Sequence, residues 1–310
     1  MPQGKLQWEW LHPVPREDPP WGRHTQTLFR IWGHGERVFA TGGLGMSGVI
    51  LRSLRPGSPF RAKKLGALHG LRGGWSCSQD EIYVVGEYGT ILHTVNAGGD
   101  WDKEDCGTGA CLYKVWGFSR DDVFVTGDGG LLLRSTDGGK SWAPTQTNIN
   151  ERLLGVWGFA PSTLLACGDG GAIIRSDDGG QSWVRQKSGV KKPLCAGWGP
   201  DAERMCAVGD SGIILTTTDG GRRWVQRKGV TRHDVEDVCG TSGGELLAVA
   251  GDGKLLRSSD GGESWSQEQT ETDEHLWSVW LCPDSGRIYI SADEGVIQVA
   301  QLEVGPRSLI

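Results

Sequence analysis

The segment SSDGGESW, residues 258–265, is one of five related turns in this chain. It places two glycines between an aspartate and a tryptophan, a composition typical of a tight turn. The other four turns are TVNAGGDW (94–101), STDGGKSW (135–142), SDDGGQSW (176–183) and TTDGGRRW (217–224). Steps of 41 residues separate the tryptophans that close the five turns, which indicates an internally repeated structure.

A second series of large residues repeats with the same step. It consists of Trp75, Trp116, Trp157, Trp198 and Trp280, with Cys239 in the place of the sixth member. Within residues 112–147, four short apolar runs (LYKVWGF, DVFVTGD, GLLLRST and SWAPTQT) are separated by Gly and Asp turns. Each run is too short for a helix, so every repeat predicts four strands, the content of one β-propeller blade.

The number of repeats predicts seven blades, starting near residues 28, 68, 112, 153, 194, 235 and 276. We therefore expect an all-β chain in which residues 1–310 form a single seven-bladed β-propeller of four-stranded antiparallel blades. The last repeat contains only three strand-like runs. The segment KLQWEWL (5–11), followed by a proline-rich linker over 12–27, is the predicted fourth strand. Such an N-terminal strand would close the ring and protect its edges.

The five turns are expected to hold strands together rather than to carry out chemistry. Ser and Asp side chains in such turns accept hydrogen bonds from nearby backbone amides, and glycine permits a positive φ. The closing tryptophan anchors the hairpin by burial. The predicted structural residues are Asn96, Asp137, Asp178, Asp219 and Asp260, with Trp101, Trp142, Trp183, Trp224 and Trp265.

These S-x-D-x-G-x-x-W turns resemble Asp-box (BNR) repeats. The whole repeat, VWGF…DVFVTGDGGLLLRSTDGGKSW, is similar to that of the seven-bladed propellers of the photosystem II assembly and stability factor-like group. The resemblance extends over nearly the whole chain and implies that the Asp boxes are structural and lie away from ligand sites. Because fold does not imply function, it carries over a scaffold role rather than a photosystem partner.

Composition and charge limit the classes of function. The net charge of −6 means that any site for an anionic partner must be local. No segment approaches transmembrane length, and the N-terminus lacks the apolar core of an export signal. Most of the eight cysteines lie in apolar runs and no Cys or His spacing fits zinc, which favours a soluble, reduced, cytoplasmic protein without cofactor or metal.

Sialidases share Asp boxes, so a carbohydrate-binding or glycoside-hydrolysing propeller is the alternative function. Hydrolysis of that type needs a Tyr nucleophile paired with a Glu, and a separate acid. Of the four tyrosines, Tyr83, Tyr113 and Tyr289 lie at repeated strand positions, while Tyr88 follows Glu87 in a turn. Acidic residues at the second turn of the blades also recur (Glu87, Asp128, Asp169, Asp210 and Asp293), which indicates turn chemistry rather than an active site. We therefore expect no catalytic residues.

The links between blades differ from one another and are the predicted place for function. Because strands alternate in direction, these links share one face with the second turn of each blade, here called the link face, and the Asp boxes lie on the opposite Asp-box face. The links 184–194 and 225–235 are basic, and the link 267–277 is acidic. The candidate partner-binding residues are Arg185, Lys187, Lys191, Lys192, Arg227, Lys228 and Arg232.

Two interpretations of these links stay open. Charged loops are commonly only solvated, whereas neighbouring basic and acidic sectors can orient a protein partner. Nucleic acid is disfavoured, since the basic links lack interleaved aromatic residues and acidic turns share their face. We expect another protein as the partner, as part of a larger complex, with a glycan as the less favoured ligand and no membrane insertion.

Overall fold

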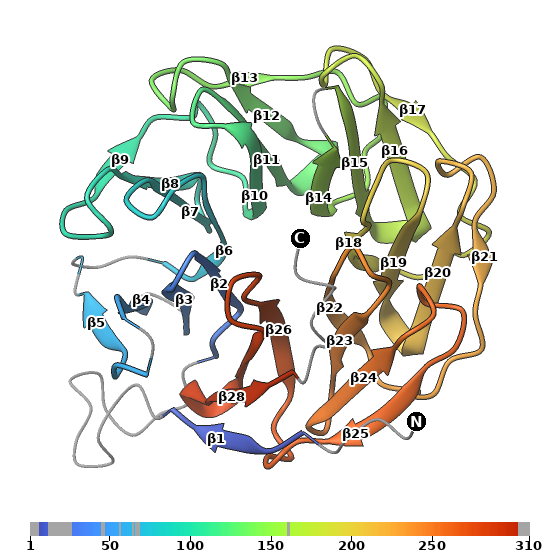
Figure 1. Cartoon of the computed structure of the whole chain (residues 1–310). Coiled ribbons are helices and arrows are strands. Elements are labelled where there is room, and N and C mark those ends of the chain that lie inside the picture. Colours follow the sequence, from blue (N-terminus) through green and yellow to red (C-terminus); the bar gives the residue numbers. More distant parts are fainter. Residues whose placement is uncertain are drawn as a thin grey trace.

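The computed structural model of the chain describes residues 6–11, 27–44, 47–55, 57–63, 65, 69–159 and 162–302. These residues form seven four-stranded antiparallel sheets arranged as blades around a central axis (Figure 1). The predicted all-β, seven-bladed propeller is confirmed. The predicted linker over 12–27 and the blade start near residue 68 lie outside the described residues, except for Thr27.

The strands of the first six blades pair in chain order, with the first strand innermost (Figure 1). Blades 1 to 3 consist of β2 (Arg30–His34), β3 (Arg37–Leu44), β4 (Ser47–Ser53) and β5 (Arg61–Lys63); β6 (Leu71–Ser76), β7 (Ile82–Gly86), β8 (Thr90–Thr94) and β9 (Asp102–Glu104); and β10 (Leu112–Ser119), β11 (Asp122–Gly127), β12 (Leu132–Ser135) and β13 (Ala143–Pro144). Blades 4 to 6 consist of β14 (Leu153–Phe159), β15 (Thr163–Gly168), β16 (Ala172–Ser176) and β17 (Val184–Arg185); β18 (Leu194–Trp198), β19 (Met205–Gly209), β20 (Ile213–Thr217) and β21 (Val225–Gln226); and β22 (Val235–Gly240), β23 (Leu246–Ala250), β24 (Lys254–Ser258) and β25 (Ser266–Gln269). Short 3-10 turns, η1 (Asp128–Gly130), η2 (Asp169–Gly171), η3 (Asp210–Gly212) and η4 (Asp293–Gly295), join second and third strands.

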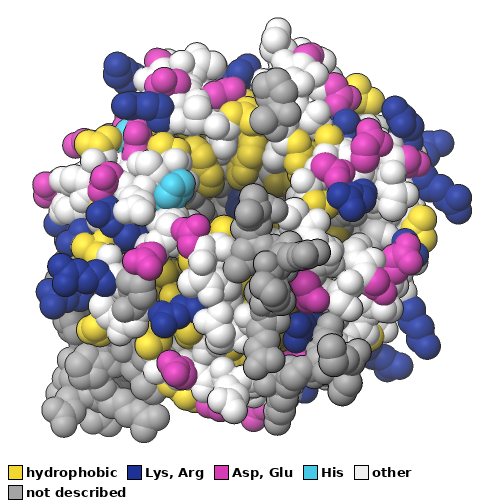
Figure 2. Space-filling model, in the orientation of Figure 1, with side chains coloured by type: hydrophobic (Ala, Val, Ile, Leu, Met, Phe, Trp, Pro, Cys, Tyr) yellow, Lys and Arg dark blue, Asp and Glu magenta, His cyan; other side chains and the backbone are white. Residues whose placement is uncertain are grey.

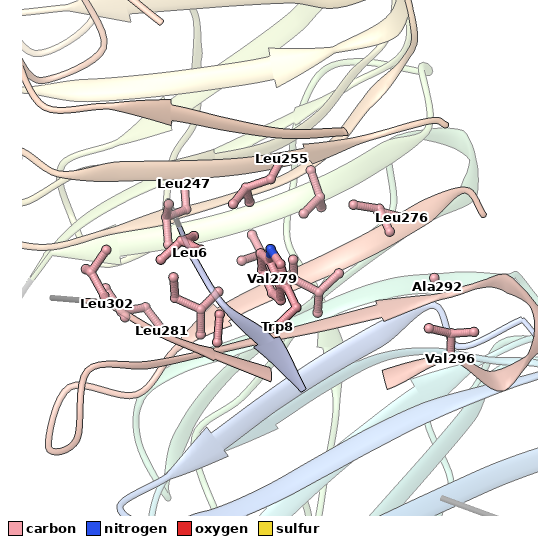
Figure 3. Close-up of a cluster of buried hydrophobic side chains, with 14 residues drawn as sticks. Leu6, Trp8, Leu247, Leu255, Leu276, Val279, Leu281, Ala292, Val296 and Leu302 are labelled. Carbon is pink, nitrogen blue, oxygen red and sulfur yellow. The ribbon is translucent and has the colours of Figure 1, made fainter. Parts of the chain in front are cut away.

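The last blade combines the two ends of the described chain. It contains β26 (Leu276–Leu281), β27 (Arg287–Ala292) and β28 (Ile297–Gln301), and its outermost strand is β1 (Trp8–Trp10). In the antiparallel register Trp8 lies opposite Ala300. Leu6 and Trp8 are buried in the apolar cluster between blades 6 and 7 (Figure 3). The N-terminal strand therefore closes the ring, as predicted.

The repeated tryptophans of the innermost strands fix the distance between neighbouring blades. Each indole lies against a glycine of the next blade, so closely that a side chain there would collide. A Cβ at Gly158 would come within 2.7 Å of the Trp116 ring, and one at Gly33 within 2.5 Å of Trp280. The same arrangement pairs Trp32 with Gly74, Trp75 with Gly117, Trp157 with Gly197, and Trp198 with Gly240.

The contact between blades 6 and 7 differs from the other six, because Cys239 takes the place of the tryptophan. Its partner in blade 7 is not a glycine but Leu281, which belongs to the cluster against which Cys239 packs, and the Cys239 thiol lies next to the Leu281 backbone. Here the smaller residue, Cys239, lies in blade 6 and the larger one, Leu281, in blade 7, whereas at the other contacts the tryptophan comes first and the glycine lies in the next blade. The seventh contact thus conserves volume with its members exchanged, as close packing requires.

Exchanging the two sizes provides a test of this packing. We expect Cys239→Trp alone to destabilise the fold by about 1–3 kcal/mol, because the indole would overpack against Leu281. Adding Leu281→Gly rebuilds the contact found at the other blades, so the double variant should be more stable than the sum of the two single effects. Urea unfolding of all four proteins measures this coupling. Additive effects would show that the two residues do not share one packing site.

The Asp boxes share one hydrogen-bond pattern. In the last box the buried Ser258 Oγ accepts the Gly262 amide proton at 2.9 Å and donates to Asp260 Oδ1 at 2.8 Å. Asp260 Oδ1 accepts the Ser264 amide proton, and Gly262 adopts a φ of 89°, which glycine tolerates. Asn96 fills the same role in the first box, accepting the Asp100 amide at 2.8 Å. The polar groups of these turns are therefore used internally.

The buried hydroxyl at the start of the box is its most sensitive atom. Ser258→Ala should lower the free energy of unfolding by about 1–3 kcal/mol, because the buried Gly262 amide loses its acceptor. The neighbouring Ser259 is exposed and serves as a matched control, whose replacement by Ala should change stability by less than about 0.5 kcal/mol. Equal effects of the two substitutions in urea unfolding would contradict this role of Ser258.

Candidate functional site

The structure places the two basic links side by side on the link face. The link after blade 4 and the link after blade 5 meet at Ser211, in the second turn of blade 5. Lys192 Nζ donates to Ser211 Oγ at 2.5 Å, and the Ser211 amide donates to Asp234 Oδ1 at 2.7 Å. Lys187, Lys191, Lys192, Lys228 and Arg232 are exposed.

Arg185 and Arg227 are held by neighbouring side chains. Arg185 Nη1 donates to Glu151 Oε1 at 2.8 Å. Arg227 Nε donates to Thr216 Oγ1 at 2.7 Å, and its guanidinium lies 3.6 Å from Glu263 of the Asp box in blade 6. Because Glu263 belongs to the Asp-box face, Arg227 does not point its charge toward the other basic residues. The exposed lysines and Arg232 remain as a basic rim on the link face.

The recurrent acids of the second turns have local partners. Asp128 accepts the Tyr113 hydroxyl proton at 2.8 Å, and Asp169 accepts from Arg152 Nε at 2.5 Å. In the last blade Asp293 accepts the Trp277 indole proton at 2.9 Å. Each carboxylate thereby ties the start of the innermost strand to the second turn of the same blade. These carboxylates stabilise their own blades and do not come together in one acidic site.

A pocket occupies the mouth of the central channel, where the innermost strands begin. Its volume is about 210 Å³, and every blade contributes to its lining. The lining residues, here called the channel-mouth pocket, are Phe29, Arg30, Arg72, Tyr113, Lys114, Leu154, Cys195, Ala196, Glu236, Asp237 and Trp277. Figure 2 shows the face of the ring that is turned toward the viewer in Figure 1, where hydrophobic side chains lie around part of the centre.

Three charged side chains meet at the floor of the pocket. Asp237 is buried and accepts from Arg30 Nη1 at 2.5 Å and from the Ser278 hydroxyl at 2.7 Å, while Lys114 Nζ lies 3.9 Å away. Burial alone would raise the pKa of Asp237, but the charges of Arg30 and Lys114 hold it below its usual value. Burial and the nearby Arg30 lower the pKa of Lys114 to about 7.

The upper wall of the pocket is aromatic and cationic. The Arg72 guanidinium lies 4.2 Å above the Phe29 ring, and Phe29 packs edge-on against Trp277 at 5.3 Å between ring centroids. Arg72 also donates to Glu87 at 2.6 Å. Among the described residues, no group accepts a hydrogen bond from the buried Nε of Arg30 or of Arg72. The two Nε groups are therefore unsatisfied within the described chain, and the Arg72 side chain is one-third exposed.

The channel-mouth pocket was not predicted from the sequence, although a signal exists. In the strand register, Arg30, Lys114 and Asp237 occupy one equivalent position of their blades. The other blades carry Gly73, Gly155, Ala196 and Ser278 there. Three charges in a column of small residues mark the pocket, and each of the seven positions lies two residues before the repeated tryptophan or before Cys239.

The lowered pKa of Lys114 predicts a pH dependence of stability. Between about pH 7 and pH 10 the unfolded chain keeps Lys114 protonated, whereas the folded state has released that proton. Since the unfolded state then binds more protons, stability should rise with pH across this window. Burial raises the pKa of the nearby Cys167 thiol to about 12, so this thiol does not ionise in the folded state between pH 7 and pH 10. We expect the free energy of unfolding of the wild type, relative to Lys114→Met, to increase from pH 7 to pH 10, measured by urea titration. A constant difference would contradict the prediction.

The described residues hold no cluster of three or more His, Cys, Asp or Glu side chains suited to a metal ion. They also contain no helix long and apolar enough to cross a membrane. All eight cysteines are free thiols. The fold and its pocket thus define an Asp-box β-propeller whose link face carries a basic rim and a charged, aromatic channel mouth.

Comparisons with known proteins agree with this class. Residues 76–186 match the family model described as photosynthesis system II assembly factor YCF48, which confirms the predicted resemblance. A solved structure described as YCF48 bound to D1 peptide is 15% identical, covers 97% of this chain and 96% of its own, and superimposes with a TM-score of 0.75. YCF48 from Cyanidioschyzon merolae is also 15% identical, with 96% and 99% coverage and a TM-score of 0.74.

The same fold occurs in an enzyme. A streptogramin B lyase structure is 12% identical, with 96% and 98% coverage and a TM-score of 0.80. No curated protein sequence matches the chain. At such identities the structural likenesses establish the fold alone, so function has to be argued from the residues of the site.

Proposed function

We propose that this protein is a non-catalytic assembly factor or interaction scaffold that binds a polypeptide segment of another protein on its link face. The observation that carries the proposal is the combination found on that face. A basic rim on the links of blades 4 to 6 lies on the same face as a pocket lined by Arg30 and Arg72, each of which has a buried Nε without an acceptor. A carboxylate of an incoming polypeptide would pair with the partly exposed guanidinium of Arg72 in the pocket lining.

The size of the pocket fits one or two side chains rather than a folded domain. Its 210 Å³ are lined by Phe29 and Trp277 as well as by the cations. Carboxylates from the partner would meet Arg72 at the wall, while the exposed lysines of the basic rim would steer an acidic segment toward it. We therefore propose an acidic polypeptide segment as the ligand, with its carboxylate at the channel mouth.

The relatives support the class of partner. The family model belongs to an assembly factor, and the structural relative YCF48 is described with a bound D1 peptide. A propeller of this kind is therefore able to hold a peptide. The eight free cysteines fit the cytoplasm as the compartment that we propose for the protein.

The tyrosines favour binding over glycoside hydrolysis. Tyr83 and Tyr289 are buried, and burial raises the pKa of both phenols. Burial and the hydrogen bond to Asp128 also raise the pKa of Tyr113. A Tyr nucleophile needs the opposite shift, toward an easily ionised phenol. Tyr88 is exposed and packs against His69, at 4.1 Å between ring centroids.

A pull-down from the native host, read by mass spectrometry, tests the proposal. The wild type is compared with a Lys191→Glu, Lys192→Glu, Arg232→Glu variant and with Arg72→Gln, after circular dichroism has shown that both fold. We expect a stoichiometric protein partner that the triple variant and Arg72→Gln both retain poorly, because one alters the rim and the other the pocket wall.

The matched control makes the same charge change elsewhere. Lys103, Lys140 and Arg222 are exposed, on the outermost strand of blade 2 and in two Asp boxes. A Lys103→Glu, Lys140→Glu, Arg222→Glu variant should keep the partner. Loss of the partner in this control alone would place the interface away from the link face, and turnover of a fluorogenic glycoside by the wild type would overturn the non-catalytic assignment.

A further inference from the structure

A second pocket lies on the Asp-box face, between blades 5 and 6. Its volume is about 240 Å³. Met205, Cys206, Leu246 and Trp198 form its apolar walls, and Arg204, Arg227, Asp260 and Glu263 contribute to its polar lining. It is separate from the channel mouth, which opens on the other face of the ring.

The pocket exists because blade 5 lacks two large side chains. In five other blades the second and third strands place two large residues directly opposite each other. These pairs are Phe39 with Arg52, Tyr83 with His93, Phe124 with Arg134, Leu165 with Arg175, and Leu247 with Arg257. Blade 5 has Cys206 opposite Thr216 at this place.

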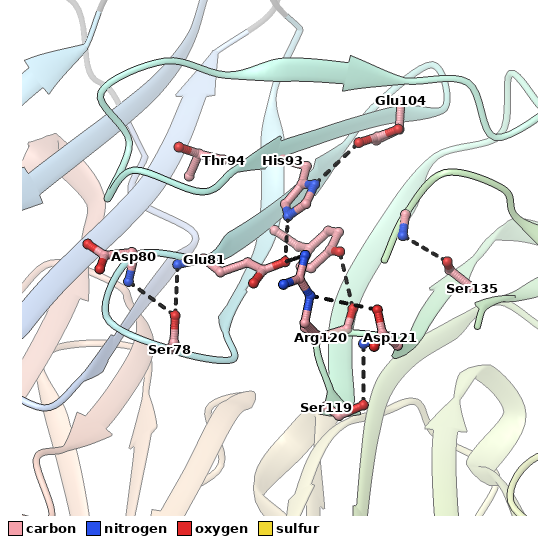
Figure 4. A network of polar contacts seen from close by, with 12 residues as sticks. Ser78, Asp80, Glu81, His93, Thr94, Glu104, Ser119, Arg120, Asp121 and Ser135 are labelled. Atoms are coloured by element: carbon pink, nitrogen blue, oxygen red, sulfur yellow. Dashed lines mark hydrogen bonds and ion pairs between the residues drawn. The ribbon is translucent and has the colours of Figure 1, made fainter. Parts of the chain in front are cut away.

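The complete pairs show what normally fills this space. In blade 2, His93 stacks on Tyr83 at 4.1 Å and lies between Glu81 and Glu104 (Figure 4). The Tyr83 ring reaches the next blade, where a Cβ at Gly139 would lie 3.1 Å from it. The pair therefore plugs the gap between two neighbouring blades.

Blade 3 contains the same plug with an arginine. The Arg134 guanidinium lies 5.2 Å from the centroid of the Phe124 ring and makes two hydrogen bonds to Asp122. A Cβ at Gly180 of blade 4 would lie 2.5 Å from Phe124. An aromatic ring under a cation, against the second glycine of the next Asp box, thus fills this site in blade 3, while leucine takes the place of the ring in blades 4 and 6.

Blade 5 keeps the cation but has lost the ring. Arg227 directly follows the outermost strand β21, and its Nε donates to Thr216 Oγ1 at 2.7 Å. Blades 3, 4 and 6 carry an arginine at the position of Thr216, so the Arg227 guanidinium takes the place of that arginine. The thiol of Cys206 is buried, and burial raises its pKa to about 12, so the floor of the pocket is uncharged. Blade 5 therefore lacks only the large side chain at the position of Cys206.

We propose that this pocket binds an aromatic side chain of a partner polypeptide, with its ring over Cys206 and against the Arg227 guanidinium. The volume is sufficient, since a cavity of about 150 Å³ accepts benzene. Met205 and Leu246 line the sides, and Glu263 keeps Arg227 in place. The contact is independent of the acidic segment proposed for the link face, because it uses other residues on the opposite face.

Titration of the full-length protein with N-acetyl-phenylalaninamide tests the proposal. The amide signals of residues 204–206 and 216–218 are followed by NMR. Saturable shifts are expected, with a dissociation constant on the order of 1 mM for a ligand this small. In the variant Cys206→Phe, Thr216→Arg, which installs the pair of blade 3, these shifts should disappear.

The controls separate loss of the site from loss of the fold. The filled variant must retain the thermal transition and the remaining NMR signals of the wild type. A second, opened variant, Cys206→Ala, keeps the pocket and should bind the probe within about threefold of the wild type. Absence of saturable shifts in the wild type, unchanged binding to the filled variant, or equal binding of N-acetyl-leucinamide would each overturn the proposal.

Discussion

The contact between an inner-strand indole and a glycine of the next blade is the constraint on which the ring depends. Neighbouring innermost strands can approach only because the glycine has no side chain, and the indole then covers it. Six such contacts and the exchanged pair of Cys239 and Leu281 determine the spacing of the seven blades. The channel mouth, which every blade lines, exists only at that spacing.

The polar residues of the chain divide into those used for this architecture and those left for binding. The Asp-box serine and aspartate bind their own turn, and the second-turn acids hold the start of their own blade. Repetition therefore indicates structure. Both pockets arise where repeats depart from one another. Charges replace small residues in the channel, and small residues replace a large pair between blades 5 and 6.

Much of the fold could be predicted from the sequence, because the step of 41 residues and the four apolar runs are local signals. The role of residues 5–11 was also predictable, since the last repeat lacks a strand. The candidate site was predictable only in its basic rim. The pairing of Arg30 with Asp237 joins residues far apart in the chain, and the orientation of Arg227 depends on Glu263 in the next blade. Such contacts follow from ring closure and not from the spacing of residues.

The proposed function requires a polypeptide partner on the link face. Hydrogen–deuterium exchange of the protein, free and bound to the partner isolated with it, tests this most directly. We expect protection in residues 184–194 and 225–235 and in the innermost-strand starts around Arg30, Arg72 and Lys114. Protection confined to the Asp boxes, with the link face exchanging as in the free protein, would contradict it.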